Sequence, residues 1–250
     1  MLCTRCRHAE ALPDGVLCPG CAAPAGFQAP PTGVAPNAWL RSPVGLGRAA
    51  AALLGLAAAV DVFALGADYF MYDVTGDPAD YASDRGDLAH TLLSVAGGAQ
   101  GFALIVCGVV YLVWFWRVRV NSEVFNPVGH RMRRGWTLGG WVVPIVNLWY
   151  PRRIMVDIWD ASSAGNRPEG RALLNAWWAL WLVSTAAGQV LYNAYDDADT
   201  SAEIHDAMSQ VMIADTLDLL AALVAAALVL RVTRMQDRKA HAGPGVAVAV

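Results

Sequence analysis

Charged residues are scarce in this 250-residue chain. Asp, Glu, Lys and Arg make up only 16% of it, hydrophobic residues make up 56%, and Lys239 is the single lysine. A soluble globular domain averages about 25% charged residues. Because long apolar runs accompany this deficit, the sequence predicts a membrane protein. No basic cluster is interleaved with aromatic residues, so we expect no nucleic-acid partner.

The sequence also lacks the motifs of familiar catalytic sites. It contains no GxSxG nucleophile elbow, no HExxH helix and no Walker phosphate loop. The histidines are scattered without paired spacing. We therefore expect a protein that is not an enzyme. The first 45 residues contain no apolar stretch of the signal-peptide type, so we expect the first helix to act as its own membrane signal.

Four long apolar segments follow the N-terminal region, at about 46–66, 92–116, 173–194 and 208–230. Each reaches the roughly 20 residues that a helix needs to cross about 30 Å of hydrocarbon. Unpaired backbone groups are costly in lipid, and continuous apolar runs are not typical of barrel strands. The sequence therefore predicts an all-α membrane protein with a four-helix transmembrane domain over residues 46–235.

Charges are sorted between the loops that join these segments. The loops 67–87 and 195–207 are acidic, whereas 117–172 and the residues after 230 are rich in arginine. The positive-inside rule places the arginine-rich sides in the cytoplasm. We therefore expect a multi-pass protein of the cell membrane, in contact with the lipid bilayer, with both termini cytoplasmic. Residues 236–250 are expected to form a disordered tail.

The segment 135–149 is apolar but short, and it contains glycines and Pro144. A further crossing here would break the charge-based topology, so we interpret it as a re-entrant or interfacial cytoplasmic segment. A surface helix is expected over 152–163, either as a gate or docking shelf or as a lid that closes the cytoplasmic end of the bundle. Tryptophans on this side are interpreted as an aromatic belt. They include Trp114, Trp116, Trp136, Trp141, Trp149, Trp159, Trp177, Trp178 and Trp181.

A long pattern of tryptophan, glycine and arginine residues runs through the same region. It reads WRVRVN at 116–121, GW at 135–136, GGWVVP at 139–144 and NLW at 147–149, followed by Pro151. The pattern resembles the signature of the bacterial domain-of-unknown-function family 4328. The resemblance covers roughly 45–235 and implies about four transmembrane helices, often after a Cys-rich or Pro-rich extension. It implies no particular activity.

Four cysteines near the N-terminus form two CxxC pairs. They are Cys3, Cys6, Cys18 and Cys21. Two such pairs can bring four thiolates to one tetrahedral zinc ion, and residues 1–22 resemble the zinc-ribbon knuckles found at the ends of many bacterial membrane proteins. The alternatives are disulfides, which are rare in the reducing cytosol, and redox CxxC chemistry, which expects a βαβ context. We expect a structural zinc site on a Pro/Gly-rich linker over 23–45.

Acidic residues also occur inside the apolar segments. Asp61 lies in the first segment, Asp215 and Asp218 lie in the fourth, and His90 lies near the outer mouth of the second. Carboxyl groups at such depth cost about 2.5–3.5 kcal/mol and are often functional. One hypothesis is therefore a proton, cation or metal site. The alternative is that Asp215 begins its span one turn late and that Asp61 caps a water-filled dent.

Arginines on the predicted cytoplasmic side suit two roles. Long arginine side chains can anchor a helix by snorkelling to the interface, or they can bind anionic lipid head groups. The candidates for head-group binding are Arg117, Arg119, Arg131, Arg133 and Arg134. Cys107, inside the second apolar segment, is expected to be a small packing residue.

Two functional hypotheses follow from these features. The first is a non-enzymatic membrane module whose zinc-binding head docks a cytoplasmic protein partner. The second is a small ion- or proton-coupled transporter or channel that uses the intramembrane carboxylates. The sequence favours the first because the four-cysteine pattern is strong and no catalytic set is present.

Overall fold

The computed structural model describes residues 40–163 and 170–242, and both stretches belong to the second of the two units into which the chain divides, 39–250. Every regular element in these stretches is a helix. The all-α fold predicted from the sequence is therefore confirmed for the part of the chain that the structure describes. The predicted four-cysteine head at 1–22 and nearly all of the predicted linker lie outside the described residues.

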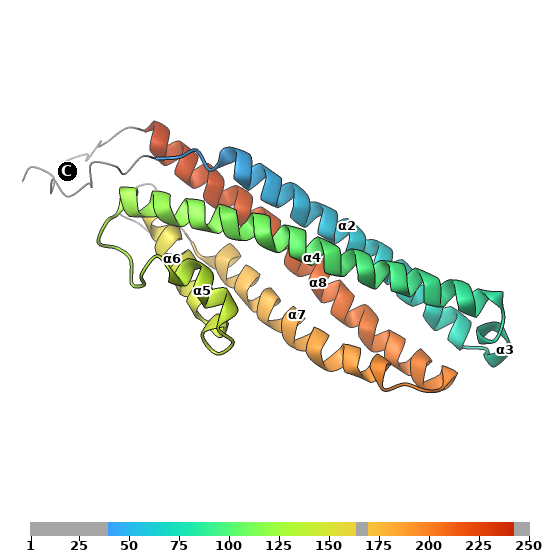
Figure 1. The fold of residues 1–250 in the computed structure, drawn as a ribbon. Helices are drawn as coiled ribbons and strands as arrows, with labels where there is room; N and C mark the ends of the chain where they lie inside the picture. The colour runs from blue at the N-terminus through green and yellow to red at the C-terminus, as the bar shows by residue number, and fades with distance from the viewer. Residues whose placement is uncertain (1–39, 164–169, 243–250) are drawn as a thin grey trace, which may run out of the picture. The chain divides into compact units, whose positions relative to one another are not determined.

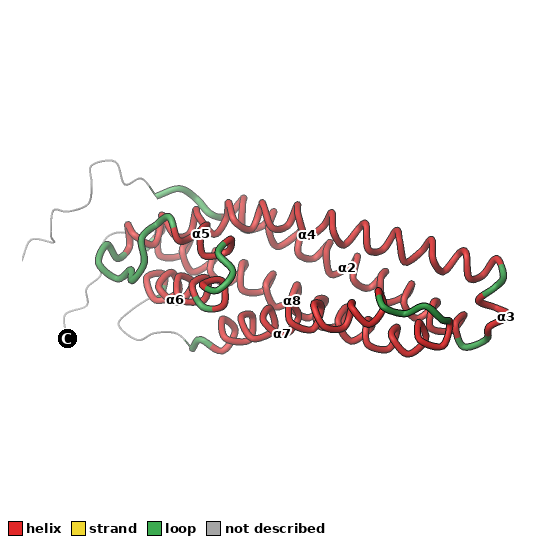
Figure 2. Tube along the Cα trace, turned by 60° about the horizontal axis from the view of Figure 1, so that its bottom comes forward, coloured by secondary structure: helices red, strands yellow, loops and turns green. Residues whose placement is uncertain are grey.

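Four long helices form the body of this unit (Figure 1). They are α2 (Val44–Thr75), α4 (Asp84–Phe125), α7 (Ala172–Asp196) and α8 (Ser201–His241). Helix α2 packs against both α4 and α8, and α7 packs along α8, as Figure 2 also shows. Helices α4 and α7 each pack mainly on a different neighbour, so the side between them is not closed by direct helix packing.

Shorter helices mark the two ends of the unit. At one end, called the α3 end here, α3 (Pro78–Tyr81) joins α2 to α4. At the other, called the α6 end, α5 (Trp136–Val142), the 3-10 helix η1 (Val146–Leu148) and α6 (Tyr150–Ser162) lie between α4 and α7 (Figure 1). The chain therefore fills the space between α4 and α7 with protein only near the α6 end.

Side-chain caps fix the helix starts at the α3 end. The side chain of Asp77 accepts a hydrogen bond from the backbone of α3, and that of Ser83 accepts one from α4. Thr200 and Glu203 form a reciprocal capping box at the start of α8. Such caps satisfy backbone N–H groups that have no partner within the helix, which gives these acidic loops a structural role.

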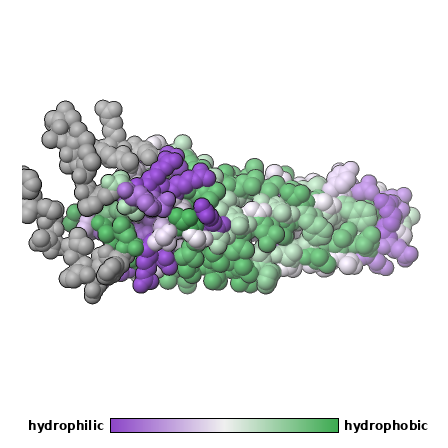
Figure 3. All heavy atoms as spheres, turned by 90° about the horizontal axis from the view of Figure 1, so that it is seen from above, coloured by the Kyte–Doolittle hydropathy of each residue, from purple (hydrophilic) through white to green (hydrophobic). Residues whose placement is uncertain are grey.

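Three helices, α2, α4 and α8, are long and apolar enough to cross a membrane, judged by length and composition. The fourth predicted span coincides with α7, which has 25 residues but is not among these three. Its sequence carries three tryptophans together with Asn175 and Gln189, which lower its hydropathy. Figure 3 shows a hydrophobic belt between hydrophilic residues at the two ends. The helices thus indicate a multi-pass membrane protein.

The main hydrophobic core lies at the α6 end, and it corrects the interpretation of the tryptophans. Trp114, Trp159, Trp177 and Trp178 are buried in a cluster formed by α4, α6, α7 and α8. Interfacial anchors would stay exposed to lipid head groups. These four residues therefore form part of the protein core and are not members of an aromatic belt.

Helix α6 is likewise more buried than a surface helix. Ile154, Met155, Val156, Asp157 and Ile158 are all buried in succession, so both of its faces are covered by protein. Of the two interpretations of 152–163, the lid over one end of the bundle fits, and an exposed docking shelf does not.

The end of α8 differs from the disordered tail expected at 236–250. Helix α8 continues to His241. Lys239 Nζ donates to the carbonyl oxygens of Ala161 at 2.8 Å and Ser163 at 3.1 Å. Carbonyl groups at a helix C-terminus lack partners within the helix, so Lys239 caps α6 and keeps the end of α8 in the fold. Residues 243–250 lie outside the described residues.

Candidate functional site

A network of buried and half-buried acidic residues joins α2 and α8 nearer the α3 end. Helix α2 contributes Asp61 and Asp68, and helix α8 contributes Asp215 and Asp218. Residues seven apart lie two turns apart on one helical face, and residues three apart are also neighbours. Both pairs therefore line the contact between α2 and α8.

Asp61 is buried and bonded to the third helix of the bundle. Gln100 Nε2 on α4 donates to Asp61 Oδ1 at 3.3 Å. The carboxyl groups of Asp218 and Asp215 lie close enough to interact electrostatically with Asp61. Like charges at short range in a low-dielectric interior repel strongly, so these carboxyl groups repel one another wherever they are ionised.

Asp68 and Asp215 face each other directly. They are 2% and 1% exposed, and their carboxyl groups lie close enough to interact with each other. Two ionised carboxylates have no donor to share. A hydrogen bond between them would require a proton, as in other carboxyl pairs that share one.

Helix α7 completes the network from the side. The hydroxyl of Tyr192 donates a hydrogen bond to Asp215 Oδ1, and the hydroxyl of Ser184 lies close to the Asp218 carboxyl group. Asp68 Oδ2, by contrast, has no hydrogen-bond partner among the residues that the structure describes. A buried acceptor without a donor is costly, and a proton or another donor supplied from outside would satisfy it.

The structure brings only some of the predicted residues of this site together. Asp61, Asp215 and Asp218 come together as one network, whereas His90 is exposed on α4 and lies 3.0 Å from the Tyr81 hydroxyl. Within 40–163 and 170–242, no group of three or more His, Cys, Asp or Glu residues could hold a metal ion.

Sequence reasoning missed Asp68, Tyr192 and Ser184. Asp68 was assigned to an acidic loop because the first apolar run ends near residue 66, but α2 continues as a helix to Thr75. The seven-residue spacing from Asp61 was the signal that could have identified Asp68 as a member of the same face. No sequence signal pairs α7 with α8, so the contribution of Tyr192 required the fold.

A second polar network lies at the α6 end. Arg119 is 2% exposed; it pairs with Glu123 at 2.7 Å and donates to the Met132 carbonyl at 2.9 Å. Arg134 binds the same Glu123 carboxylate, which raises the pKa of Arg134. Burial lowers the pKa of His130, and the positive charge of Arg119 lowers it further. These contacts fix the loop between α4 and α5.

This network changes the interpretation of the five arginines. Arg119 cannot reach a lipid head group, because its guanidinium is buried and bonded within the fold. Arg117 donates to the Ser42 carbonyl at 3.2 Å, and the Arg131 backbone N–H donates to Asp157 at 3.0 Å. Arg133 is exposed, and Arg131 and Arg134 keep part of their side chains exposed. Binding of lipid head groups therefore remains a hypothesis only for Arg131, Arg133 and Arg134.

Two buried amides tie the same end together. Asn121 Nδ2 donates to the Arg41 carbonyl at 2.8 Å and to Gln236 Oε1 at 3.1 Å. Gln236 Nε2 donates to the Val118 carbonyl at 2.8 Å and to Ser162 Oγ at 3.2 Å. These bonds connect the segment before α2 with α4, α6 and α8.

The glycines of the GGW pattern also have a packing role. A Cβ atom at Gly140 would lie 3.1 Å from Tyr150 Cβ, so glycine at this position allows α5 to approach α6 closely. Cys107 is buried, and its thiol donates to the Leu53 carbonyl at 3.2 Å. The packing role predicted for Cys107 agrees with this position.

The comparisons with known proteins give a family but no activity. No curated protein and no solved structure matches this chain. The sequence model of one family, described as a domain of unknown function, matches residues 77–234. That range covers more than half of the chain and includes the WRVRVN and GGWVVP patterns, so the resemblance seen in the sequence is confirmed. The chain belongs to the DUF4328 family.

Proposed function

We propose that this chain is a proton-coupled membrane protein in which the buried carboxyl network between α2 and α8 binds and releases a proton. The observation that carries the proposal is the burial of two neighbouring carboxyl groups, those of Asp68 and Asp215, in the contact between α2 and α8. Each buried carboxyl group is costly in an apolar helix bundle. A shared proton would relieve the repulsion between the two carboxylates, whereas packing alone gives no reason to place them together.

The arrangement supports coupling between protonation and helix packing. Three helices contribute: Asp68 from α2, Asp215 from α8, and Tyr192 from α7. Loss of the shared proton would leave two facing negative charges, which would push α2 and α8 apart. A change in protonation is thereby expected to change the relative position of helices, which is the requirement for a proton-coupled transporter.

Infrared difference spectroscopy of the purified protein in lipid nanodiscs tests most directly whether this pair of carboxyl groups holds a proton. The carbonyl stretch of a protonated carboxylic acid should be present at neutral pH and should disappear in Asp68→Asn and in Asp215→Asn. Asp206→Asn, an exposed carboxylate on α8, is the matched control and should leave the band intact. If all three variants keep the band unchanged, the proton is not shared by this pair and the proposal is wrong.

The predicted membrane arrangement belongs to the same proposal. We place α7 across the bilayer as a fourth span beside α2, α4 and α8, with both termini in the cytoplasm. Supporting this, the acidic residues gather at the α3 end and the arginines at the α6 end, as the positive-inside rule requires. Single-cysteine accessibility in a Cys-free background tests it: a cysteine at position 77 or 199 should react from outside the cell, and one at position 128 should not.

A second proposal concerns the N-terminal head. The spacing of Cys3, Cys6, Cys18 and Cys21 supports a structural zinc ion, because four thiolates leave no open coordination position. We propose that this head, once folded by zinc, docks a cytoplasmic protein. Proteins captured with and without the head should then differ, and identical partner sets would count against docking.

Metal analysis of the full-length protein tests the zinc ion separately. One zinc per chain is expected in the parent, and none in a Cys18→Ser/Cys21→Ser variant, because a two-thiolate site binds zinc far more weakly. Cys107→Ser is the control, since Cys107 lies inside α4 and should not alter the zinc content. Parent protein without zinc would exclude the metal-binding head.

A further inference from the structure

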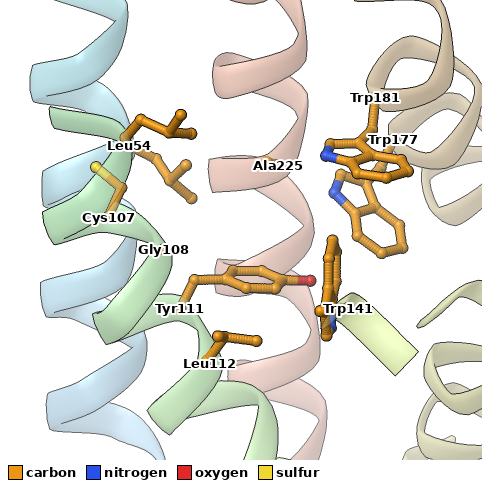
Figure 4. Close-up of a pocket in the computed structure, with 10 residues that line it drawn as sticks. Leu54, Cys107, Gly108, Tyr111, Leu112, Trp141, Trp177, Trp181 and Ala225 are labelled. Atoms are coloured by element: carbon orange, nitrogen blue, oxygen red, sulfur yellow. The ribbon is translucent and has the colours of Figure 1, made fainter. Parts of the chain in front are cut away.

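An apolar groove lies between α4 and α7, on the side that direct helix packing leaves open. Its volume is about 260 Å³, and α8 forms its floor through Ala225. Helix α4 contributes Leu104 and Tyr111, and α7 contributes Trp177 and Trp181. Trp141 of α5 lines the same groove near the α6 end (Figure 4).

The groove opens toward the lipid-facing surface. Leu104 lines it and is 74% exposed, which places this residue at the mouth. Val109 and Val113 of α4 and Val183 of α7 are also exposed, so apolar side chains of both neighbouring helices face outward around the opening. In a membrane-spanning unit, such a surface contacts acyl chains.

Two polar atoms in this apolar groove lack partners. The Tyr111 hydroxyl and the Trp141 indole Nε1 are buried, and neither has a hydrogen-bond partner among the described residues. Figure 4 shows the Tyr111 hydroxyl pointing toward the Trp141 ring. Buried tyrosine and tryptophan donors are normally satisfied. An acceptor from outside the described fold therefore fits here.

The direction of the groove matches the chemistry of a membrane lipid. Leu104 and Tyr111 are seven residues apart on α4, or about 10 Å along the helix axis. The two unpaired donors lie toward the α6 end, where Val142 and Ile145 of the short α5–η1 segment are exposed, as in an interfacial segment. Ester carbonyl oxygens of a glycerophospholipid lie at the interface, and its chains extend into the hydrocarbon. A lipid in this groove would thus place an acceptor beside the donors and a chain toward Leu104.

The volume is sufficient for part of such a chain. An apolar protein cavity of about 150 Å³ holds a benzene molecule, and this groove is larger at about 260 Å³. A water molecule would satisfy the two donors less well, because bound water typically needs two to four polar partners and the rest of the lining is apolar.

We propose that the groove between α4 and α7 binds one acyl chain of a membrane glycerophospholipid, whose ester carbonyl accepts hydrogen bonds from Tyr111 and Trp141. This inference is independent of the carboxyl network, which lies nearer the other end of the bundle and shares no residue with the groove.

A groove-filling substitution gives the sharpest test. Gly108 lines the groove, and a Cβ atom built on it meets nothing within 4 Å, so Gly108→Leu can occupy the space without disturbing a neighbour. Gly97 on the same helix also has nothing within 4 Å and does not line the groove, so Gly97→Leu is the matched control. Delipidated protein is titrated with dioleoyl phosphatidylglycerol, and bound lipid is counted by native mass spectrometry.

The parent protein and Gly97→Leu should retain one tightly bound phospholipid, and Gly108→Leu should bind it at least about tenfold more weakly. Tyr111→Phe should weaken binding by about two- to tenfold, the range for loss of one hydrogen bond, with Tyr69→Phe on the exposed face of α2 as its control. Equal binding by the two leucine variants would overturn the proposal. Binding of oleic acid but not of the phospholipid would overturn it as well, since the occupant would then be a free fatty acid.

Discussion

Close packing of α2 against α8 at the α6 end gives a prediction of stability that can be worked from one distance. A Cβ atom at Gly47 would lie 2.2 Å from Thr233 Oγ1 and 2.8 Å from Thr233 Cγ2. Ordinary contacts begin near 3.4 Å, so Gly47→Ala forces the helices apart or turns the Thr233 side chain. The same Thr233 oxygen accepts a hydrogen bond from Trp114 Nε1 at 3.0 Å, and turning Thr233 would break it.

Two costs therefore add in Gly47→Ala. Overpacking of a tight contact costs about 1–3 kcal/mol, and loss of the indole hydrogen bond costs about 0.5–1.5 kcal/mol. We expect a loss of about 2–4 kcal/mol, measured as a lower midpoint of thermal unfolding in detergent by tryptophan fluorescence. Gly55→Ala on the same helix, where nothing lies within 4 Å, should instead be neutral or slightly stabilising. Equal midpoints for the two alanine variants would refute the packing argument.

Two further predictions concern the α6 end. Gln236→Leu leaves the partners of a buried amide unsatisfied, so it should lower the free energy of unfolding by about 1–3 kcal/mol. The control, Gln189→Leu at an exposed position, should change the free energy of unfolding little. Equal losses in the two variants would contradict a structural role of the Gln236 amide. Because burial and Arg119 lower the pKa of folded His130, its contribution to stability is full above the unfolded-state pKa of about 6.5 and is lost as the pH falls below that value. The midpoint of thermal unfolding should therefore drop between pH 7 and pH 5, and it should drop less in His130→Gln. Identical pH profiles for the parent protein and this variant would show that His130 does not cause the drop.

Most of the helices could be predicted from the hydrophobicity of the sequence alone. The apolar runs at 46–66, 92–116 and 208–230 all lie inside helices, because run length reports the requirement for internal backbone hydrogen bonding in lipid. The helix ends were predicted less well. Thr75 and His241 lie well beyond the apolar runs, since capping and contacts with other helices extend a helix where hydropathy gives no signal.

The burial of the aromatic and basic residues could not be predicted in the same way. Trp114 and Arg119 have the sequence positions of interfacial anchors, yet both are buried. Trp114 is buried in the core cluster that includes residues of α6, α7 and α8, and Arg119 is bonded to Glu123 and to the Met132 carbonyl of the α4–α5 loop. A helix that packs inside the bundle and one that lies on the membrane surface have similar amphipathic sequences, so only the tertiary contacts distinguish them.

The depth of the carboxyl network bears on the proton-coupled function proposed above. Exposed apolar residues of α4 occur from Leu88 to Val113, and the part of this series from Val95 to Val113 rises about 27 Å, which is close to the hydrocarbon thickness. Gln100, the partner of Asp61, lies about 8 Å inside the Val95 edge of this part. Asp68 lies about 10 Å further along α2 toward the α3 end, near the edge of the belt, where water is close.

Between Asp61 and the α6 end, the sequence of α2 from 49 to 60 contains only alanine, leucine, glycine and valine. A proton that enters at Asp68 therefore has no polar side chain on α2 to carry it beyond Asp61. Under the proposed function, we expect passage to the other side to need movement of the helices, as in a coupled transporter. Liposomes that contain the protein should accordingly show no proton leak above that of empty liposomes when a pH gradient is imposed, measured with an entrapped pH-sensitive dye. A steady leak abolished by Asp61→Asn would mean that the resting helix bundle already conducts.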